Sequence, residues 1–207
     1  KFIMNKKNLI IVFTRNPELG KVKTRLAKTV GASSALDIYT FLLEHTEIII
    51  RNIISDKAVY YSEKIREGDL WDNNIYLKYL QEGDDLGEKM HNAFKNAFNK
   101  DYEKVVIVGS DLFDLKESHL LEAFQKLNTR DVVIGPAKDG GYYLLGMKTL
   151  NTDVFTNKNW GTSSVLKDTL KDFRKCKVHQ LEELNDIDTY EDMKNNIILK
   201  KLITKHA

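Results

Sequence analysis

Residues 9–26 read LIIVFTRNPELGKVKTRL, a short apolar run followed by a loop that is rich in positive charge. The run at residues 9–14 is typical of a strand that is buried on both faces of a parallel sheet. The basic side chains that follow it within one loop are Arg15, Lys21, Lys23 and Arg25. The stretch therefore predicts a buried strand that ends at a cationic loop.

The rest of the chain continues this alternation of apolar strands and helices. Further strands are predicted at residues 57–61, 75–80, 104–108, 131–135, 142–147 and 177–181. Helices are predicted from a cap at Ser33 or Ser34 to residue 54, from Asp85 to residue 98, at residues 117–127, from Thr162 to residue 173, and after Thr189. Such alternation predicts an α/β fold with a mostly parallel central sheet flanked by helices. Ligands of such sheets bind at the carboxyl ends of the strands.

Length and composition limit the classes of protein to consider. The length of 207 residues, without linkers or repeats, predicts one domain at residues 4–207. The formal net charge is only +2, so we expect no nucleic acid partner. No apolar stretch approaches the length of a membrane span, so we expect none. The single cysteine, Cys176, excludes an intramolecular disulfide and fits a reducing compartment, so we expect a cytoplasmic protein. The sequence leaves the oligomeric state open.

The cationic loop has the chemistry of a phosphate site. Arg and Lys side chains suit phosphate oxygens, and a helix that begins near Lys23 would add its free N–H groups. Gly20 permits a sharp turn or a close approach of the backbone to a ligand. The loop matches neither the Walker A pattern nor the dinucleotide-binding fingerprint, and a solvated basic loop is the alternative. The candidate phosphate-binding residues are Arg15, Gly20, Lys21, Lys23, Thr24 and Arg25.

An acidic segment follows the predicted strand at residues 104–108. Asp111 leaves the sheet there, where a ligand is expected. A carboxylate beside a polyphosphate commonly holds Mg²⁺ or Mn²⁺, which neutralises phosphate charge, so we expect one of these ions. Asp114 either assists Asp111 in holding the ion or caps the next helix, and the cap is the favoured interpretation. Asp188 is either a second metal ligand or only a favourable charge at the start of the last helix.

Two glycines and an acid join the predicted strands at residues 131–135 and 142–147. Asp139-Gly140-Gly141 is a good turn signal, so a plain hairpin is one interpretation. A carboxylate and two bare backbones at a strand end also suit recognition of a sugar or base, next to Tyr142. Asp139 is then the candidate catalytic base near the sugar or acceptor. Trp160 is interpreted either as a pocket wall or as a core residue.

Taken together, these segments resemble a bacterial family of small GT-A-like transferases, classed as glycosyltransferases and in part linked to arsenosugar biosynthesis. The matching stretches span nearly the whole chain in the order of the family: FTRNPELGKVKTRL (13–26), QEGDDLGEKM (81–90), GSDLFDL (109–115), GPAKDGGYYLLGM (135–147), WGTSSVL (160–166) and DIDTYED (186–192). Asp85, within the second stretch, joins the candidate nucleotide-binding residues. The family is also similar to phospholactate guanylyltransferases and molybdenum-cofactor nucleotidyltransferases, which share the nucleotide-diphospho-sugar transferase fold.

The resemblance implies a single-domain GT-A-like fold and roles for particular residues. The resemblance implies that Arg15, Lys23 and Arg25 contact phosphates. It also implies that Asp111 stands at the metal-binding position and that Asp188 is a second candidate metal ligand. The chain departs from the family pattern at Phe113, where the family usually has proline after Gly-Ser-Asp-x. It also carries an extra acid, Asp84, before the usual Gly-Asp-Leu-Gly pattern. The first departure changes the turn after Asp111 but keeps its carboxylate.

Three functions are consistent with these residues. The leading hypothesis is metal-dependent glycosyl transfer from a nucleotide-sugar to a small-molecule acceptor, with Asp111 and Asp139 as catalytic residues. The second is nucleotidyl transfer, in which an acceptor phosphate attacks a nucleoside triphosphate and pyrophosphate leaves. The third is a nucleotide-binding module without catalysis. Release of a nucleoside diphosphate or of pyrophosphate distinguishes the first two.

Overall fold

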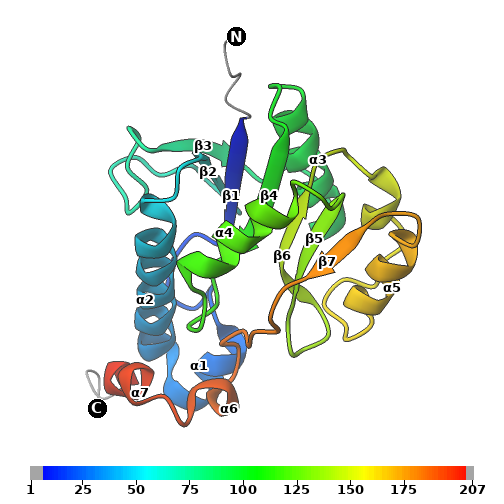
Figure 1. The fold of residues 1–207 in the computed structure, drawn as a ribbon. Helices are drawn as coiled ribbons and strands as arrows, with labels where there is room; N and C mark the ends of the chain where they lie inside the picture. Colours follow the sequence, from blue (N-terminus) through cyan, green and yellow to red (C-terminus); the bar gives the residue numbers. More distant parts are fainter. Residues whose placement is uncertain (1–6, 204–207) are drawn as a thin grey trace.

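Strand β1 (Asn8–Thr14) is apolar because it lies inside the sheet and helices cover both of its faces. The computed structural model describes residues 7–203, and its strands lie in the order β3-β2-β1-β4-β6-β5-β7 (Figure 1). The other strands are β2 (Asp56–Tyr61), β3 (Tyr76–Leu80), β4 (Lys104–Gly109), β5 (Val132–Pro136), β6 (Tyr142–Met147) and β7 (Val178–Gln180). The predicted strands are therefore all present, with small shifts of their ends.

One strand runs against the others. β1 is parallel to both β2 and β4, and β3 and β7 are parallel to their neighbours β2 and β5. β6 is antiparallel to β4 and to β5. This confirms the predicted α/β fold with a mostly parallel central sheet. Because β6 reverses, the loop from β5 to β6 lies at the same edge as the carboxyl ends of β1 and β4.

Helices pack on both faces of the sheet through two apolar clusters. On one face, α2 (Ala32–Arg51) and α4 (Glu117–Lys126) join the cluster that contains Ile10 and Val12. On the other face, α3 (Leu86–Phe98), α5 (Val165–Asp172) and the 3₁₀-helix η1 (Thr152–Phe155) join the cluster of Leu9 and Ile11. A third cluster packs α1 (Thr24–Val30), α6 (Tyr190–Met193) and α7 (Ile197–Ile203) against α2.

Two predicted helix caps, at Asp85 and Thr189, are confirmed, and others are wrong. The Asp85 carboxylate accepts a hydrogen bond from Glu88 N (2.8 Å), as expected of the cap of α3. Neither Ser33 nor Ser34 caps α2, because Gly31 adopts a φ of 83° and lets the chain pass from α1 directly into α2. Thr162 donates its hydroxyl to the Asn159 carbonyl (2.8 Å), and α5 begins only at Val165.

The last predicted helix is two helices. Thr189 is the N-cap of α6 in a capping box with Asp192, whose carboxylate accepts from the Thr189 N–H and hydroxyl (2.7 and 2.8 Å). The chain then breaks, and the Asn196 side chain accepts from the N–H groups of Ile198 and Leu199 (3.0 and 3.1 Å) at the start of α7. The single domain at residues 4–207 stays a prediction, and residues 4–6 and 204–207 lie outside the described part. Within residues 7–203, every helix is too short or too polar to span a bilayer.

Candidate functional site

Four separate segments meet at the carboxyl edge of the sheet. The loop after β1 brings Lys23, the segment after β4 brings Asp111, and the β5–β6 loop brings Asp139. The strand-like segment before α6 lies beside the segment after β4, because Ile187 N donates to the Asp111 carbonyl (3.0 Å). Asp186 and Leu112 also form an isolated antiparallel bridge. The sheet topology thus gathers acids and bases that are distant in sequence.

The Lys23 ammonium group is the centre of this arrangement. Its Nζ lies 2.9 Å from Asp111 Oδ2 and 2.9 Å from Asp188 Oδ1, and its side chain is only 4% exposed. Burial by itself lowers the pKa of Lys23, but the charges of Asp111 and Asp188 outweigh burial and raise it. Arg25, which is largely exposed, also pairs with the Asp188 carboxylate.

The backbone at Lys23 is itself unusual. Lys23 directly precedes α1 and adopts a φ of 48°, in the left-handed region. Residues other than glycine seldom take this conformation, and those that do concentrate at functional sites. The left-handed turn directs the chain from the loop into α1 while the side chain reaches the two carboxylates.

Tyr39 anchors the start of the cationic loop. Its hydroxyl accepts from Arg15 N (2.8 Å), lies 3.2 Å from the Arg15 carbonyl and contacts the Thr14 hydroxyl (3.1 Å). Burial, and then the charge of Asp111, raise the pKa of Tyr39, so the phenol stays protonated. Asn16 fixes the next position, because its side chain donates to the Lys64 carbonyl (2.8 Å) and accepts from Glu63 N (2.9 Å). Neither residue stood out in the sequence.

Asp186 is a further acid that the sequence gave no reason to select. Burial, followed by the charges of Asp111 and Asp139, raises its pKa to about 7. The sequence placed Asp186 only beside a helix start. Its selection depends on the fold, because burial and two distant carboxylates determine its properties.

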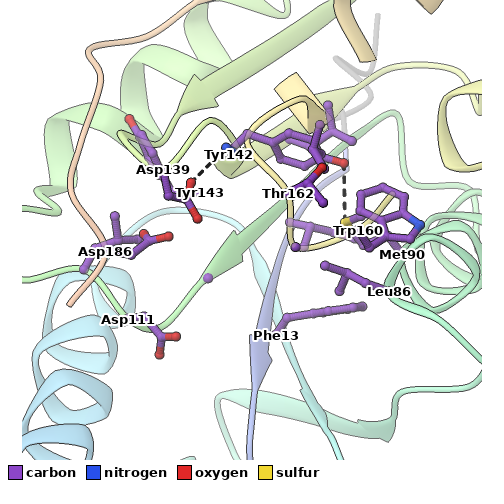
Figure 2. A pocket seen from close by; sticks show the side chains of 17 residues that line it. Phe13, Leu86, Met90, Asp111, Asp139, Tyr142, Tyr143, Trp160, Thr162 and Asp186 are labelled. Atoms are coloured by element: carbon purple, nitrogen blue, oxygen red, sulfur yellow. Dashed lines mark hydrogen bonds between the residues drawn. The ribbon is translucent and has the colours of Figure 1, made fainter. Parts of the chain in front are cut away.

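Three pockets adjoin at this edge, and Asp111 lines all of them. The cationic pocket, of 170 Å³, is lined by Arg15, Val22, Lys23, Thr24, Arg25, Tyr39, Asp111 and Asp188. The polar pocket, of 550 Å³, lies over the ends of β1, β2 and β3 and includes Asn16, Lys21, Ser62, Gln81 and Lys89. The aromatic pocket, of 230 Å³, includes Phe13, Leu86, Met90, Asp139, Tyr142, Trp160 and Asp186 (Figure 2).

Most of the predicted phosphate-binding residues lie together. Arg15, Lys23, Thr24 and Arg25 line the cationic pocket. Lys21 lines the polar pocket and pairs with Glu18 (2.8 Å) and Glu63 (3.2 Å). Two candidates lie elsewhere: Gly20 forms the turn of the loop with a φ of 76°, and Asp85 serves as a helix cap. Neither of these two lines any of the three pockets.

The candidates for substrate binding divide in the same way. Gly141, Tyr142 and Trp160 line the aromatic pocket, together with the catalytic candidate Asp139. The Asp139 carboxylate accepts from Gly141 N (2.8 Å), which fixes its direction within the loop. Gly140 does not line this pocket, and its carbonyl accepts from Leu166 N (2.9 Å).

The β5–β6 loop is therefore a hairpin connection that also carries pocket residues.

The predicted cap at Asp114 is wrong, because α4 begins after Lys116 and Asp114 is exposed. Phe113, the departure from the family pattern, packs in the third cluster against Phe41 and His45. It does not line the aromatic pocket.

The side chains supply two carboxylates for a cation. Within residues 7–203, no group of three or more His, Cys, Asp or Glu side chains is arranged to hold a metal ion. Asp111 and Asp188 meet through the one ammonium group that contacts both. Two carboxylates suit Mg²⁺ when phosphate oxygens and waters complete the coordination. The donor set thus fits an ion that arrives with a diphosphate.

Comparisons with known proteins agree with this fold. The profile of a bacterial family described as "Uncharacterized protein conserved in bacteria (DUF2064)" matches residues 50–162. A crystal structure described as a "putative nucleotide-diphospho-sugar transferase", from Desulfovibrio desulfuricans G20, is 31% identical with a TM-score of 0.83, covering 96% of this chain and 97% of that one. No curated protein sequence matches the chain.

More distant structures share only the fold. The 4-diphosphocytidyl-2C-methyl-D-erythritol synthase from Anaerococcus prevotii DSM 20548 is 14% identical with a TM-score of 0.58, covering 97% of this chain and 96% of that one. The inositol-1-phosphate CTP transferase from T. maritima is also 14% identical, with a TM-score of 0.54 and the same coverage of 97% and 96%. Identities this low bear on architecture alone.

Proposed function

The chain belongs to the bacterial family DUF2064, and it is similar over nearly its whole length to the structure described as a "putative nucleotide-diphospho-sugar transferase". We propose that it transfers a sugar from a nucleotide-sugar to a small-molecule acceptor. The observation that carries this proposal is the position of Asp111, which lines the cationic, polar and aromatic pockets at once. The diphosphate and the nucleoside of a nucleotide-sugar match the cationic and polar pockets, and the sugar then lies beside Asp111, where the aromatic pocket is left for the acceptor.

Two parts of the donor, the diphosphate and the nucleoside, have a pocket of suitable chemistry. The diphosphate binds in the cationic pocket, where Arg15, Lys23 and Arg25 carry the positive charge. The nucleoside occupies the larger polar pocket, in which Phe13 offers an apolar face and Asn16 and Gln81 lie at the wall. The sugar then lies near Asp111, at the entrance to the aromatic pocket.

A divalent ion belongs to the proposal. Asp111 and Asp188 would hold Mg²⁺ or Mn²⁺, which supplies charge neutralisation of the leaving diphosphate. The Lys23 ammonium contacts both carboxylates, so its binding to the phosphate and its pairing with these acids are alternatives. Lys23 and Arg25 also stabilise the negative charge that develops on the diphosphate as the bond to the sugar breaks.

The transfer step itself needs a base close to the hydroxyl group of the acceptor molecule. The acceptor oxygen attacks the anomeric carbon, and the bond from that carbon to the phosphate oxygen breaks with its electron pair on the diphosphate. The hydroxyl proton passes to Asp139, whose carboxylate is oriented by Gly141 N at 2.8 Å. The products are the glycosylated acceptor and a nucleoside diphosphate.

Nucleotidyl transfer is the second candidate, and the concentration of basic side chains favours it. Arg15, Lys23 and Arg25 in one small pocket, with Lys21 beside it, also suit a triphosphate. An acceptor phosphate would then attack the α-phosphorus, and pyrophosphate would leave.

The product assay tests the proposal. The protein is incubated with Mn²⁺ and a panel of nucleotide-sugars or nucleoside triphosphates, and nucleoside diphosphate and pyrophosphate are measured separately. We expect nucleoside diphosphate from one nucleotide-sugar, and a decrease in its rate of about 10²–10³-fold in Asp111→Asn. Asp114→Asn is the matched control, because Asp114 is exposed and lies outside the three pockets. Pyrophosphate release would identify nucleotidyl transfer, and wild-type turnover by Asp111→Asn would refute the role of Asp111.

A further inference from the structure

The aromatic pocket has two chemically different sides. In Figure 2, Asp111, Asp139 and Asp186 lie on one side, and Phe13, Leu86, Met90 and Trp160 lie on the other. The acids come from three segments of the chain, and the charges of Asp111 and Asp139 both act on Asp186. A ligand in this pocket therefore meets carboxyl groups on one side and apolar surface on the other.

Positive side chains are missing from this pocket. Among the described residues that line it, none is lysine, arginine or histidine. The basic side chains of the site lie instead in the cationic and polar pockets, on the other side of Asp111. A phosphate group carries about −1.5 to −2 charges at neutral pH. Such a group in the aromatic pocket would face the Asp139 carboxylate with no cation among the lining residues, because Lys23 lines the neighbouring cationic pocket and is paired there with Asp111 and Asp188. Like charges at this range repel.

The size and the apolar side limit the ligand further. The volume of 230 Å³ is smaller than the roughly 300–1,000 Å³ of pockets for drug-sized ligands. The Trp160 indole and the Phe13 ring offer flat apolar surface, which favours an apolar body and also attracts cations. The Tyr142 hydroxyl donates a weak hydrogen bond to the Met90 sulfur (3.9 Å).

Resting on the proposed function, we propose that the acceptor is a small molecule without phosphate, neutral or positively charged, with an apolar body against Trp160 and its hydroxyl toward Asp139. An enzyme that transfers a nucleotide to a phosphorylated acceptor requires the opposite charge in its acceptor pocket. The acids and apolar side chains of this pocket therefore disfavour a phosphorylated acceptor, and with it nucleotidyl transfer to such an acceptor.

Three probes of one shape and different charge test the proposal: 2-phenylethanol, 2-phenylethylamine and 2-phenylethyl phosphate. Binding is measured as the change in tryptophan fluorescence, because Trp160 lines the pocket and the second tryptophan, Trp71, is buried in the core. Trp160→Phe shows whether the signal comes from the pocket. We expect the alcohol and the amine to bind at least about tenfold more tightly than the phosphate ester.

Charge variants make the test specific. In Asp139→Asn the preference against the phosphate ester should fall by about threefold to tenfold, because one of the facing charges is gone. Glu44→Gln is the matched control, since Glu44 is exposed on α2, which contributes no residue to this pocket. Its preference should equal that of the wild type.

Two results would overturn the acceptor class: binding of the phosphate ester as tight as that of the alcohol, or no Trp160 signal with any probe. The proposed function is tested separately by stabilisation with a nucleoside diphosphate. Stabilisation without probe binding refutes only the acceptor class. Probe binding without stabilisation by any nucleotide refutes the nucleotide-sugar proposal and leaves the chemistry of the pocket intact.

Discussion

The Lys23 ammonium group contacts two carboxylates that a divalent cation would also bind. It lies 2.9 Å from an oxygen of Asp111 and 2.9 Å from one of Asp188. Lysine is a compact point charge on a flexible stem, so the same group is able to move to a phosphate. In the absence of nucleotide, Lys23 should therefore compete with Mg²⁺ or Mn²⁺ for the two acids.

Replacement of this lysine tests the competition. In Lys23→Met, Asp111 and Asp188 lose their shared counter-charge, so we expect Mn²⁺ to bind about tenfold more tightly without nucleotide. Turnover with a nucleotide-sugar should nevertheless fall, because the phosphate loses a cation. Isothermal titration with Mn²⁺ gives the affinity. Lys21→Met removes the same charge from a more exposed position that pairs with Glu18 and Glu63, and should leave Mn²⁺ affinity unchanged. Equal affinities for all three proteins would show that these acids are not the metal site.

At the scale of elements, the β5–β6 loop packs tightly against the segment before α5. Gly140 has a φ of 89°, and a Cβ atom there would lie 2.3 Å from the Ser163 carbonyl oxygen. The Gly140 carbonyl also accepts from Leu166 N (2.9 Å). This contact positions Asp139 and Gly141, the loop residues that line the aromatic pocket.

Alanine substitutions at two glycines separate crowding from backbone strain. Gly140→Ala should reduce the free energy of unfolding by about 2–4 kcal/mol, because it adds both strain and a clash. Gly20→Ala should cost only about 1 kcal/mol, because Gly20 has a φ of 76° but no atom within 4 Å of the added Cβ. Urea unfolding measures both values. An equal cost at the two positions would mean that Ser163 yields easily and that the loop is not held by this contact.

For the whole molecule, one sheet connects every part of the site. The cationic pocket depends on β1 and β4, and the aromatic pocket depends also on β6 and on the segment before α5. A ligand that binds across these pockets should therefore stabilise the described fold as one unit. The same reasoning predicts a single unfolding transition with and without ligand.

Thermal unfolding checks this expectation. A nucleoside diphosphate at about a hundredfold its Kd stabilises by about 2.7 kcal/mol, which corresponds to about 5–10 °C for a chain of this length. Arg25→Ala should reduce the increase in Tm at the same ligand concentration, because Arg25 lines the cationic pocket. Arg174→Ala is the control, since Arg174 is exposed and outside the three pockets. Two separate transitions, with only one of them sensitive to ligand, would contradict the single unit.

The sequence predicted the strands well because each buried strand is an apolar run that is visible locally. The hairpin interpretation of Asp139-Gly140-Gly141 implied that β6 is antiparallel to β5, but the sequence did not predict that β6 also pairs with β4, because this pairing depends on contacts made through space. The cap at Asp85 could be predicted because it depends on neighbouring residues in the sequence, Asp85 and Glu88. The failure at Ser33 and Ser34 came from Gly31, whose φ of 83° starts the helix without a polar cap.

The candidate site was predictable where charge alone marks a residue. Lys23, Arg25, Asp111 and Asp139 stood out as charged residues beside predicted strand ends. Tyr39 did not, because it is a helix residue whose role arises from its contacts with the loop after β1. Asp186 did not, because its raised pKa depends on burial and on acids from two other segments.

The pairing of Lys23 with Asp188 joins positions that are 165 residues apart in the chain. Protein synthesis proceeds from the amino-terminal end, so the strand and loop that carry Lys23 leave the ribosome long before their partner acid exists. Until Asp188 has been translated, the lysine lacks one of its two counter-charges. A nascent chain therefore carries an incomplete cationic pocket until the segment that holds Asp188 has been translated.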